Sequence, residues 1–325
     1  MRGSSSTLLS IVFIFLLISC TKSFNSKRRT RVYVLLMNTS KFWFNYRQTT
    51  NTLYFYRLLR DRGIPDENIL LFSGDNIACN SRNNDPGTVT CYDGQREPNI
   101  YNSLELDYKN DEVSTKNWLD VLRKRYHPSL PFRKRLLSDS NSALFVFMSG
   151  HGGDYYHKIQ DKGIMSYDEF ARAIRELYAK QGYHDMLIIS DSCGSFTIFD
   201  AIDEPNIIML GASLKGELSH SFGHCAIIEQ PKFDRFSKQT VEYLMTHDNV
   251  NFETLMRIYD PNFLNGNAGM RHTYPAPDAL RTHRIGQFIK ANFEEEYSKE
   301  SFESEAQHSN EEKKTLEKLA NLLLE

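Results

Sequence analysis

Hydrophobic residues along the chain gather in short continuous runs that alternate with segments of helical periodicity. Five apolar runs of strand length are typical of strands buried on both faces of a parallel sheet. They are residues 31–37, 68–72, 143–148, 185–190 and 206–211. Apolar residues at helical spacing, with helix start or stop signals, mark residues 51–62, 115–126 and 166–180. This alternation predicts a mainly parallel α/β sheet with helices on both faces.

The remaining segments set the expected boundaries. Residues 73–107 are rich in Asn, Asp, Gly and Pro without periodicity, so we expect a long excursion from the sheet. Residues 1–23 hold a basic residue and then an apolar run, 8–20, that is short for a membrane span, which predicts a signal peptide. We expect a catalytic domain at 30–285 and an acidic polar tail at 286–325.

The last turns of that tail carry leucines at helical spacing, which predicts a short amphipathic helix. Its leucines are Leu316, Leu319 and Leu323. The helix either docks onto a partner or lies on the surface of the protein.

Composition excludes several classes of protein. With 39 basic and 41 acidic residues, the formal net charge of −2 gives no field that would gather nucleic acid, so we expect no nucleic-acid partner. Five cysteines are too few for a disulfide framework, and no CxxC pair suggests structural zinc. In an oxidising compartment, Cys79 and Cys91 either bridge each other or one of them pairs with another chain.

Candidate chemistry follows two neighbouring predicted strands. The run 143–148 leads into Ser149-Gly150-His151-Gly152-Gly153, and the run 185–190 leads into Asp191-Ser192-Cys193-Gly194. Because ligands bind outside the carboxyl ends of parallel strands, we expect His151 and Cys193 to face one cleft. A neighbouring imidazole can accept the thiol proton and later return it to a leaving amine. The pattern therefore predicts a catalytic Cys-His dyad.

The glycines beside this dyad suit an oxyanion site. The N–H of Gly152, together with that of Cys193, is placed to stabilise a tetrahedral oxyanion. Taken singly, a cysteine is usually a buried apolar residue and a histidine usually structural. Their joint occurrence after strands, 42 positions apart, favours catalysis.

Two other site classes fit poorly. A serine hydrolase with a His-Gly-Gly oxyanion loop also needs a G-x-S-x-G elbow, which this chain lacks. A metal site is disfavoured because His151 and His157 lie six residues apart on an expected loop rather than on one helical face.

Several segments together resemble the catalytic subunits of GPI-anchor transamidase, a legumain-related C13 family of the caspase-like cysteine peptidase clan. The His-Gly-Gly and Asp-x-Cys loops also fit legumain-type and caspase-type enzymes, whereas Phe-Trp-Phe-Asn-Tyr-Arg is far more specific. The resemblance covers about residues 31–245 and implies a caspase-like three-layer α/β/α sandwich. The segments that carry it are residues 38–47, 63–66, 78–80, 149–153 and 191–193.

The resemblance implies an enzyme of the endoplasmic reticulum lumen that cleaves the carboxy-terminal signal of a proprotein. Cys193 would hold the resulting thioester, and the new carboxyl would pass to the ethanolamine amine of the GPI glycolipid. Asn45 would orient His151 as third member of the triad. A legumain-type asparaginyl endopeptidase is the first alternative. A non-catalytic scaffold is disfavoured because His151 and Cys193 are both retained.

The resemblance also implies a structural ion and a covalent partner. No cofactor is expected for the chemistry, but Asp66, Glu105 and Asp107 match acidic positions of a structural calcium site, with solvated surface carboxylates as the alternative. Cys79 matches the cysteine that links this subunit to its T-type partner. An intrachain bond to Cys91 or a free thiol is the alternative.

The chain departs from the family in its ends and beside the site. Many members finish in a transmembrane helix, whereas this chain finishes in an acidic tail, so we expect no span of its own after signal cleavage and attachment through partner subunits. Residues 154–157, Asp-Tyr-Tyr-His, also differ from the usual pattern. The sequon at Asn38 falls at a strand end beside the site, so we expect it to be buried and unglycosylated.

Overall fold

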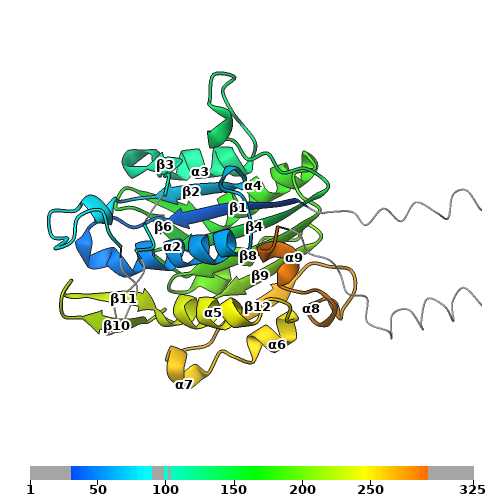
Figure 1. The fold of residues 1–325 in the computed structure, drawn as a ribbon. Coiled ribbons are helices and arrows are strands. Elements are labelled where there is room, and N and C mark those ends of the chain that lie inside the picture. Colours follow the sequence, from blue (N-terminus) through cyan, green and yellow to red (C-terminus); the bar gives the residue numbers. More distant parts are fainter. Residues whose placement is uncertain (1–30, 90–98, 102–103, 292–325) are drawn as a thin grey trace, which may run out of the picture. The chain divides into compact units, whose positions relative to one another are not determined.

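A seven-stranded sheet organises the computed structural model, which describes residues 31–89, 99–101 and 104–291. The strand order is β12-β9-β8-β4-β1-β2-β3 (Figure 1). Neighbouring strands are parallel, except that β12 runs antiparallel to β9. The strands are β1 Arg31–Asn38, β2 Ile69–Ser73, β3 Tyr108–Lys109, β4 Ser142–Ser149, β8 Asp185–Asp191, β9 Ile207–Gly211 and β12 Gly269–His272.

Helices cover both faces of this sheet because its central strands bury side chains in both directions. Along β1, Val32, Val34 and Leu36 join one apolar cluster, and Tyr33, Leu35 and Met37 join the other. The first cluster includes residues of α2, α5, α6 and α9, and the second includes residues of α3 and α4. The prediction of a three-layer, mainly parallel α/β/α architecture is therefore confirmed.

The helices are short apart from those that flank the central strands. The α-helices are α2 Tyr46–Asp61, α3 Thr115–Leu122, α4 Tyr167–Ala179, α5 Arg235–Thr246, α6 Phe252–Met256, α7 Pro261–Leu264, α8 Ala279–Thr282 and α9 Gly286–Ile289. The 3-10 helices are η1 Trp43–Asn45, η2 Asp66–Asn68, η3 Ile77–Cys79, η4 Asn110–Glu112, η5 Phe132–Lys134 and η6 Ser195–Phe199.

The sequence located the main strands well but placed some helix ends wrongly. The five predicted strands correspond to β1, β2, β4, β8 and β9. Helix α2 begins at Tyr46, before the predicted start at 51, because its first turns bury polar residues such as Gln48 and Thr50 and so lack an apolar pattern. At α4 the predicted capping box is present, with Ser166 N–H donating to Glu169 Oε2 over 3.1 Å.

The carboxy-terminal boundary also lies later than predicted. Residues 286–289, assigned to the tail, form α9, whose Phe288 and Ile289 are fully buried in the first apolar cluster. The compact unit comprises Thr30–Asn292. The predicted signal peptide and the predicted amphipathic helix lie outside the described residues.

Two small antiparallel sheets, neither predicted, border the carboxyl edge of the main sheet. One consists of β5 Gly152–Gly153, β6 Tyr156–Ile159 and β7 Gly163–Ser166. The other is a hairpin of β10 Ser221–Cys225 and β11 Gln230–Asp234, which packs beside α2 (Figure 1). Trp43 Nε1 donates to the carbonyl of Ile228 over 3.0 Å and so ties η1 to this hairpin.

Candidate active site

The loops that carry His151 and Cys193 leave the sheet side by side. Strands β4 and β8 are parallel neighbours, and their last residues, Ser149 and Asp191, are paired in register. One residue further on, the N–H of Gly150 donates to the carbonyl of Asp191 over 3.2 Å. The predicted adjacency of the two loops is therefore present in the structure.

Glycines allow these loops to interlock. A Cβ added at Gly152 would lie 2.8 Å from Ser192 Oγ, and one at Gly194 would lie 2.8 Å from the carbonyl carbon of Gly153. Gly194 also has a φ of 58°, in the left-handed region that favours glycine. Cys193, partly exposed, lies between Ser192 and Gly194 and is thereby held against the loop of His151.

Asn45 fixes the orientation and the tautomer of His151. Its Oδ1 lies 2.8 Å from His151 Nε2, while its Nδ2 donates to the carbonyl of Lys41 over 2.7 Å. Since the amide nitrogen is already a donor to Lys41, the amide oxygen accepts from Nε2–H. This leaves the lone pair on Nδ1 as the base. Asn45, inferred only through the family resemblance, immediately precedes α2.

The surroundings of His151 favour the neutral imidazole. Its pKa lies below the ordinary value, first because the ring is largely buried and then because Arg47 and Lys158 are positively charged. The negative charges of Asp234 and Asp161 oppose this shift. A histidine with a lowered pKa remains an available proton acceptor at neutral pH.

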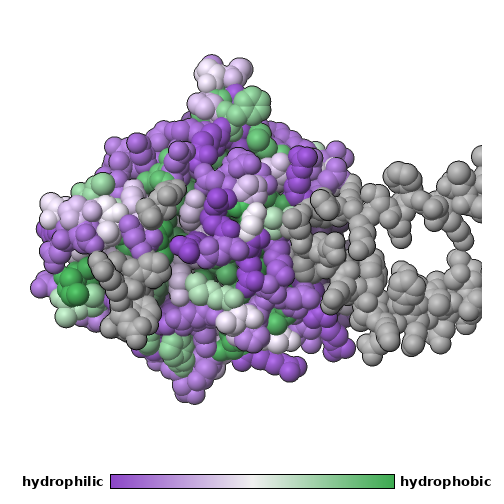
Figure 2. All heavy atoms as spheres, in the orientation of Figure 1, coloured by the Kyte–Doolittle hydropathy of each residue, from purple (hydrophilic) through white to green (hydrophobic). Residues whose placement is uncertain are grey.

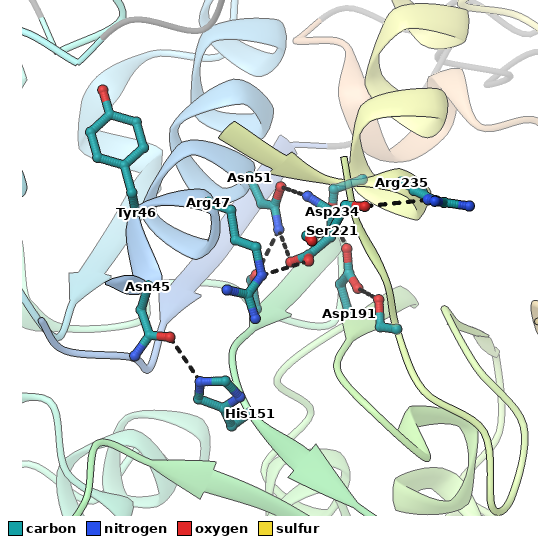
Figure 3. A network of polar contacts seen from close by, with 12 residues as sticks. Asn45, Tyr46, Arg47, Asn51, His151, Asp191, Ser221, Asp234 and Arg235 are labelled. Atoms are coloured by element: carbon teal, nitrogen blue, oxygen red, sulfur yellow. Dashed lines mark hydrogen bonds and ion pairs between the residues drawn. The ribbon is translucent and has the colours of Figure 1, made fainter. Parts of the chain in front are cut away.

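A polar network unforeseen from the sequence lies beside His151 (Figure 3). Arg47, on α2, pairs through Nε with Asp234 Oδ1 over 2.9 Å. The other oxygen, Oδ2, accepts from Asn51 Nδ2 over 2.6 Å, and Asn51 Oδ1 accepts from the N–H of Asp234 over 3.0 Å. Because Asn51 Nδ2 also donates to Ser149 Oγ over 3.1 Å, the network joins α2, β11 and the end of β4.

Asp191, two residues before Cys193, adds a second buried carboxylate. It accepts from Ser219 Oγ over 2.6 Å and from Ser237 Oγ over 2.5 Å. Its pKa is raised, first by complete burial and then by the negative charge of Asp234. The site thus places one carboxylate that is paired with Arg47 near a second, Asp191, that is held by the hydroxyls of Ser219 and Ser237 and the backbone of Ser237.

The backbone around Gly152 suits the predicted oxyanion role. Strand β5 pairs Gly152 with His157, and the N–H of Lys158 donates to the carbonyl of His151 over 2.9 Å. Hydrogen-bonded and non-hydrogen-bonded pairs alternate along an antiparallel ladder. Because this bond joins the preceding pair, His151 and Lys158, the pair of Gly152 and His157 is not hydrogen-bonded, and the N–H of Gly152 points away from β6. His157 itself is fully buried, which lowers its pKa to about 3, and it contacts Thr39 Oγ1 at 3.2 Å.

The three carboxylates predicted to bind calcium do converge, but around a guanidinium. Arg133 lies 2.5 Å from Asp66, 3.2 Å from Glu105 and 3.1 Å from Asp107. Burial raises the pKa of Asp107 to about 6, and its Oδ1 is buried without a hydrogen bond. Within the described ranges, no group of three or more His, Cys, Asp or Glu residues is arranged to hold a metal ion.

The remaining predicted positions have mixed outcomes. Cys79 is an exposed free thiol at the end of η3, and its candidate intrachain partner, Cys91, lies outside the described residues.

Asn38 is fully buried, as predicted, and donates to Thr49 Oγ1 over 2.9 Å. Of the helices that the structure describes, none is long and apolar enough to cross a bilayer.

Known proteins resemble the chain over most of its folded part. The Peptidase C13 family matches residues 32–262. A putative GPI-anchor transamidase of Caenorhabditis elegans is 39% identical over 68% of this chain and 69% of that protein. The GPI-anchor transamidases of Saccharomyces cerevisiae and Homo sapiens are 36% and 39% identical over 71% and 66% of this chain.

These alignments differ in how much of each relative they cover. The chain spans 56% of the yeast protein and 54% of the human protein, about half of their length. Among solved structures, a caspase-1 from Spodoptera frugiperda matches with a TM-score of 0.46 and 10% identity, over 82% of this chain and 93% of that one.

Proposed function

Because the chain belongs to the peptidase C13 family, we propose that it is a thiol transamidase that moves the acyl group of a proprotein onto the amine of a GPI glycolipid. The observation that carries this proposal is the 2.8 Å contact between Asn45 Oδ1 and His151 Nε2. This contact leaves Nδ1 as the base, on a loop that interlocks with that of Cys193. The identity to GPI-anchor transamidases supports the choice of acceptor.

The reaction would proceed in two acyl transfers. His151 Nδ1 takes the proton of the Cys193 thiol, and the thiolate attacks the scissile carbonyl carbon. The N–H groups of Gly152 and Cys193 stabilise the oxyanion, and His151 returns its proton to the leaving amine. The acyl group is then a thioester on Cys193. Attack by an amine breaks the carbon–sulfur bond and releases the thiolate, and His151 Nδ1 takes the proton that the amine loses.

Exposed apolar side chains beside Asn45 suit a substrate with an apolar segment. Phe42 and Phe44 are 46% and 56% exposed, and their rings stack at 5.8 Å. Ile227, at the turn of the β10–β11 hairpin, is 72% exposed. Figure 2 shows hydrophobic residues gathered at this end of an otherwise largely hydrophilic face. Such a patch is typical of a binding surface.

The proposed setting is the lumen of the endoplasmic reticulum, within a complex of transamidase subunits. The exposed thiol of Cys79 supports a disulfide to a T-type partner, since a bond between chains needs an accessible sulfur. Partner subunits would then supply the attachment to the membrane. They would also present the proprotein and the glycolipid to Cys193.

A structural calcium ion is a further part of the proposal. The donor chemistry fits, because Asp66, Glu105 and Asp107 supply hard carboxylate oxygens and Asp107 Oδ1 is buried without a hydrogen bond. The ion would take the place among them that Arg133 occupies. It would brace the loop before β3 and has no part in the chemistry at Cys193.

The test replaces Cys193 by Ala in cells or microsomes and follows a reporter proprotein. We expect GPI attachment to stop and uncleaved proprotein to accumulate, because no thioester forms. The matched control is Cys225→Ala, which removes the other partly exposed free thiol in β10 and leaves attachment unchanged. Normal attachment in the Cys193 variant would overturn the assignment. Release of a free carboxylic acid by the unaltered chain, with no amide product, would indicate an endopeptidase instead.

A further inference from the structure

A third loop meets the two loops of the dyad. It follows β9 and comprises residues 213–219. The N–H of Gly194, next to the nucleophile, donates to the carbonyl of Glu217 over 2.9 Å. From the same loop, the N–H of Gly216 donates to Asp154 Oδ1 over 2.8 Å. This loop is therefore fixed against both catalytic loops, and Asp154 lies where the three meet.

Asp154 places a carboxylate directly beside the residue after Cys193. A Cβ added at Gly194 would lie 2.6 Å from Asp154 Oδ1 and 2.8 Å from the Asp154 backbone nitrogen. Oδ1 accepts the bond from Gly216, whereas Oδ2 has no hydrogen-bond partner among the residues that the structure describes. The side chain is partly exposed. A carboxylate oxygen is thus available next to the nucleophile.

Lys215 adds a positive charge at the same junction. Its ammonium is exposed, donates to the hydroxyl of Tyr155 over 2.9 Å and lies 4.9 Å from the centre of that ring. Tyr155 follows Asp154 directly and has a left-handed φ of 70°, which fixes the direction of its side chain. The pKa of Lys215 is raised, first by its hydrogen bond to Tyr155 and then by neighbouring negative charges that include Asp154. Within the described chain no ion pair joins Lys215 to Asp154, so both side chains can still contact a ligand.

A carboxylate beside Gly194 and an exposed ammonium on the adjoining loop, with no ion pair between them within the described chain, match a zwitterionic ligand of opposite polarity. We propose that Asp154 and Lys215 form the acceptor subsite, which binds a primary amine joined by a short chain to a phosphate. Asp154 Oδ2 accepts a hydrogen bond from the amine, and Lys215 with the Tyr155 hydroxyl donates to phosphate oxygens. This inference rests on the proposed transamidase function and identifies the groups that select the acceptor.

The subsite would act by positioning the amine. The ligand arrives as an ammonium and loses one proton to water. The neutral amine still donates an N–H to Asp154, which directs its lone pair at the thioester carbon. As the carbon–nitrogen bond forms, the amine gives a second proton to His151 Nδ1, the carbon–sulfur bond breaks and Cys193 leaves as thiolate. The products are an amide, the free thiolate and protonated His151.

The test compares two acceptors in microsomes that contain the assembled complex. One is the endogenous glycolipid with its ethanolamine phosphate, and the other is hydrazine, a small amine without phosphate. In Asp154→Asn and in Lys215→Met, we expect attachment to the glycolipid to fall by roughly 10- to 100-fold, the loss of one charge-assisted hydrogen bond. In Lys215→Met, hydrazide formation should stay within about twofold of the unaltered chain, because hydrazine has no phosphate for Lys215 to bind. In Asp154→Asn it should fall as well, because Asp154 contacts the amine of either acceptor.

The control variants remove one acidic and one basic side chain that lie away from the junction of the three loops. Asp111→Asn, in η4, and Lys162→Met, between β6 and β7, each remove one partner of the exposed ion pair that joins these two side chains. They should leave both products unchanged.

The outcomes distinguish failure of the acceptor subsite from failure of the proposed transamidase function. Equal loss of both products in the Lys215 variant, or unchanged attachment to the glycolipid in either variant, would overturn the subsite. An unaltered chain that forms neither product would overturn the transamidase function itself.

Discussion

Asn45 Oδ1 and His151 Nε2 lie 2.8 Å apart although 106 residues separate them in the chain. Asn45 is held in turn by its bond to the carbonyl of Lys41, so the segment between β1 and η1 determines which imidazole nitrogen is basic. The base is thus oriented by a neutral amide rather than by a carboxylate. An amide cannot neutralise an imidazolium, so Asn45 acts chiefly by orientation.

Replacing Asn45 by Ala should leave Cys193 in place but free the ring of His151 to rotate and change tautomer. We expect the rate of Cys193 alkylation by iodoacetamide to fall roughly 10- to 100-fold, the usual cost of losing an orienting partner. The control is Asn84→Ala, which removes an exposed amide bonded to the carbonyl of Ile227. Alkylation of the Asn45 variant at the unaltered rate would show that the contact does not orient the base.

The adjacency of the loops that carry His151 and Cys193 was predictable from the sequence because each loop follows an apolar strand. Asn45 had no such signal, since it ends a single 3-10 turn and does not directly follow a strand, and only the family resemblance identified it. Arg47 and Asp234 were missed because their ion pair spans 187 residues and depends on the β10–β11 hairpin lying beside α2. The only available sign was a run of polar residues, 48–52, that proves to be buried.

Gly194→Ala should destabilise the fold more than backbone strain alone explains. A left-handed alanine costs roughly 1–2 kcal/mol, and its Cβ would also collide with Asp154 and Gly153. Gly223→Ala is the matched control, because Gly223 has a φ of 70° but no atom within 4 Å of the added Cβ. Urea unfolding of both variants measures the difference, and equal losses would mean that the catalytic loops are not tightly interlocked.

The lowered pKa of His151 should respond to removal of the positive charge of Lys158. Lys158→Met removes a positive charge that lowers this pKa, so the pKa should rise and the neutral base should be lost at a higher pH. NMR titration of the imidazole in a Cys193→Ala background measures this without coupling to the thiol. Lys162→Met, whose lysine pairs with Asp111, should leave the titration unchanged. A fall in the pKa would contradict the electrostatic account.

The folded boundary was harder to predict than the strands. Composition places the start of the tail at 286 because charged residues dominate beyond that point, yet Phe288 and Ile289 pack beneath β1 and β4. A helix of four residues is too short to give a periodic pattern. The short strands β5 to β7 escaped prediction for the same reason.

Arg133→Leu tests whether the guanidinium and calcium compete for the same carboxylates. Without Arg133, the pKa of Asp107, already about 6, should rise further, and stability should be lost as the pH rises through that value. At pH 7.5 we expect the unfolding temperature to fall by roughly 2–4 °C and calcium to restore it. Arg57→Leu, which removes an exposed pair with Asp61, is the control. If calcium changes the unfolding temperature of neither the unaltered protein nor the Arg133 variant, the proposal of a calcium site is wrong.

The burial of Asn38 has a consequence for biosynthesis. Its side chain is completely enclosed at the end of β1, between β2 and β4, yet it begins an Asn-Thr-Ser sequon. A glycan added to the emerging chain would be too bulky for this position and would prevent the central strand from docking. In a glycosylating compartment, burial of Asn38 in the folded sheet and attachment of a glycan to it therefore exclude each other. A newly made molecule that folds slowly is committed to the modified, misassembled form.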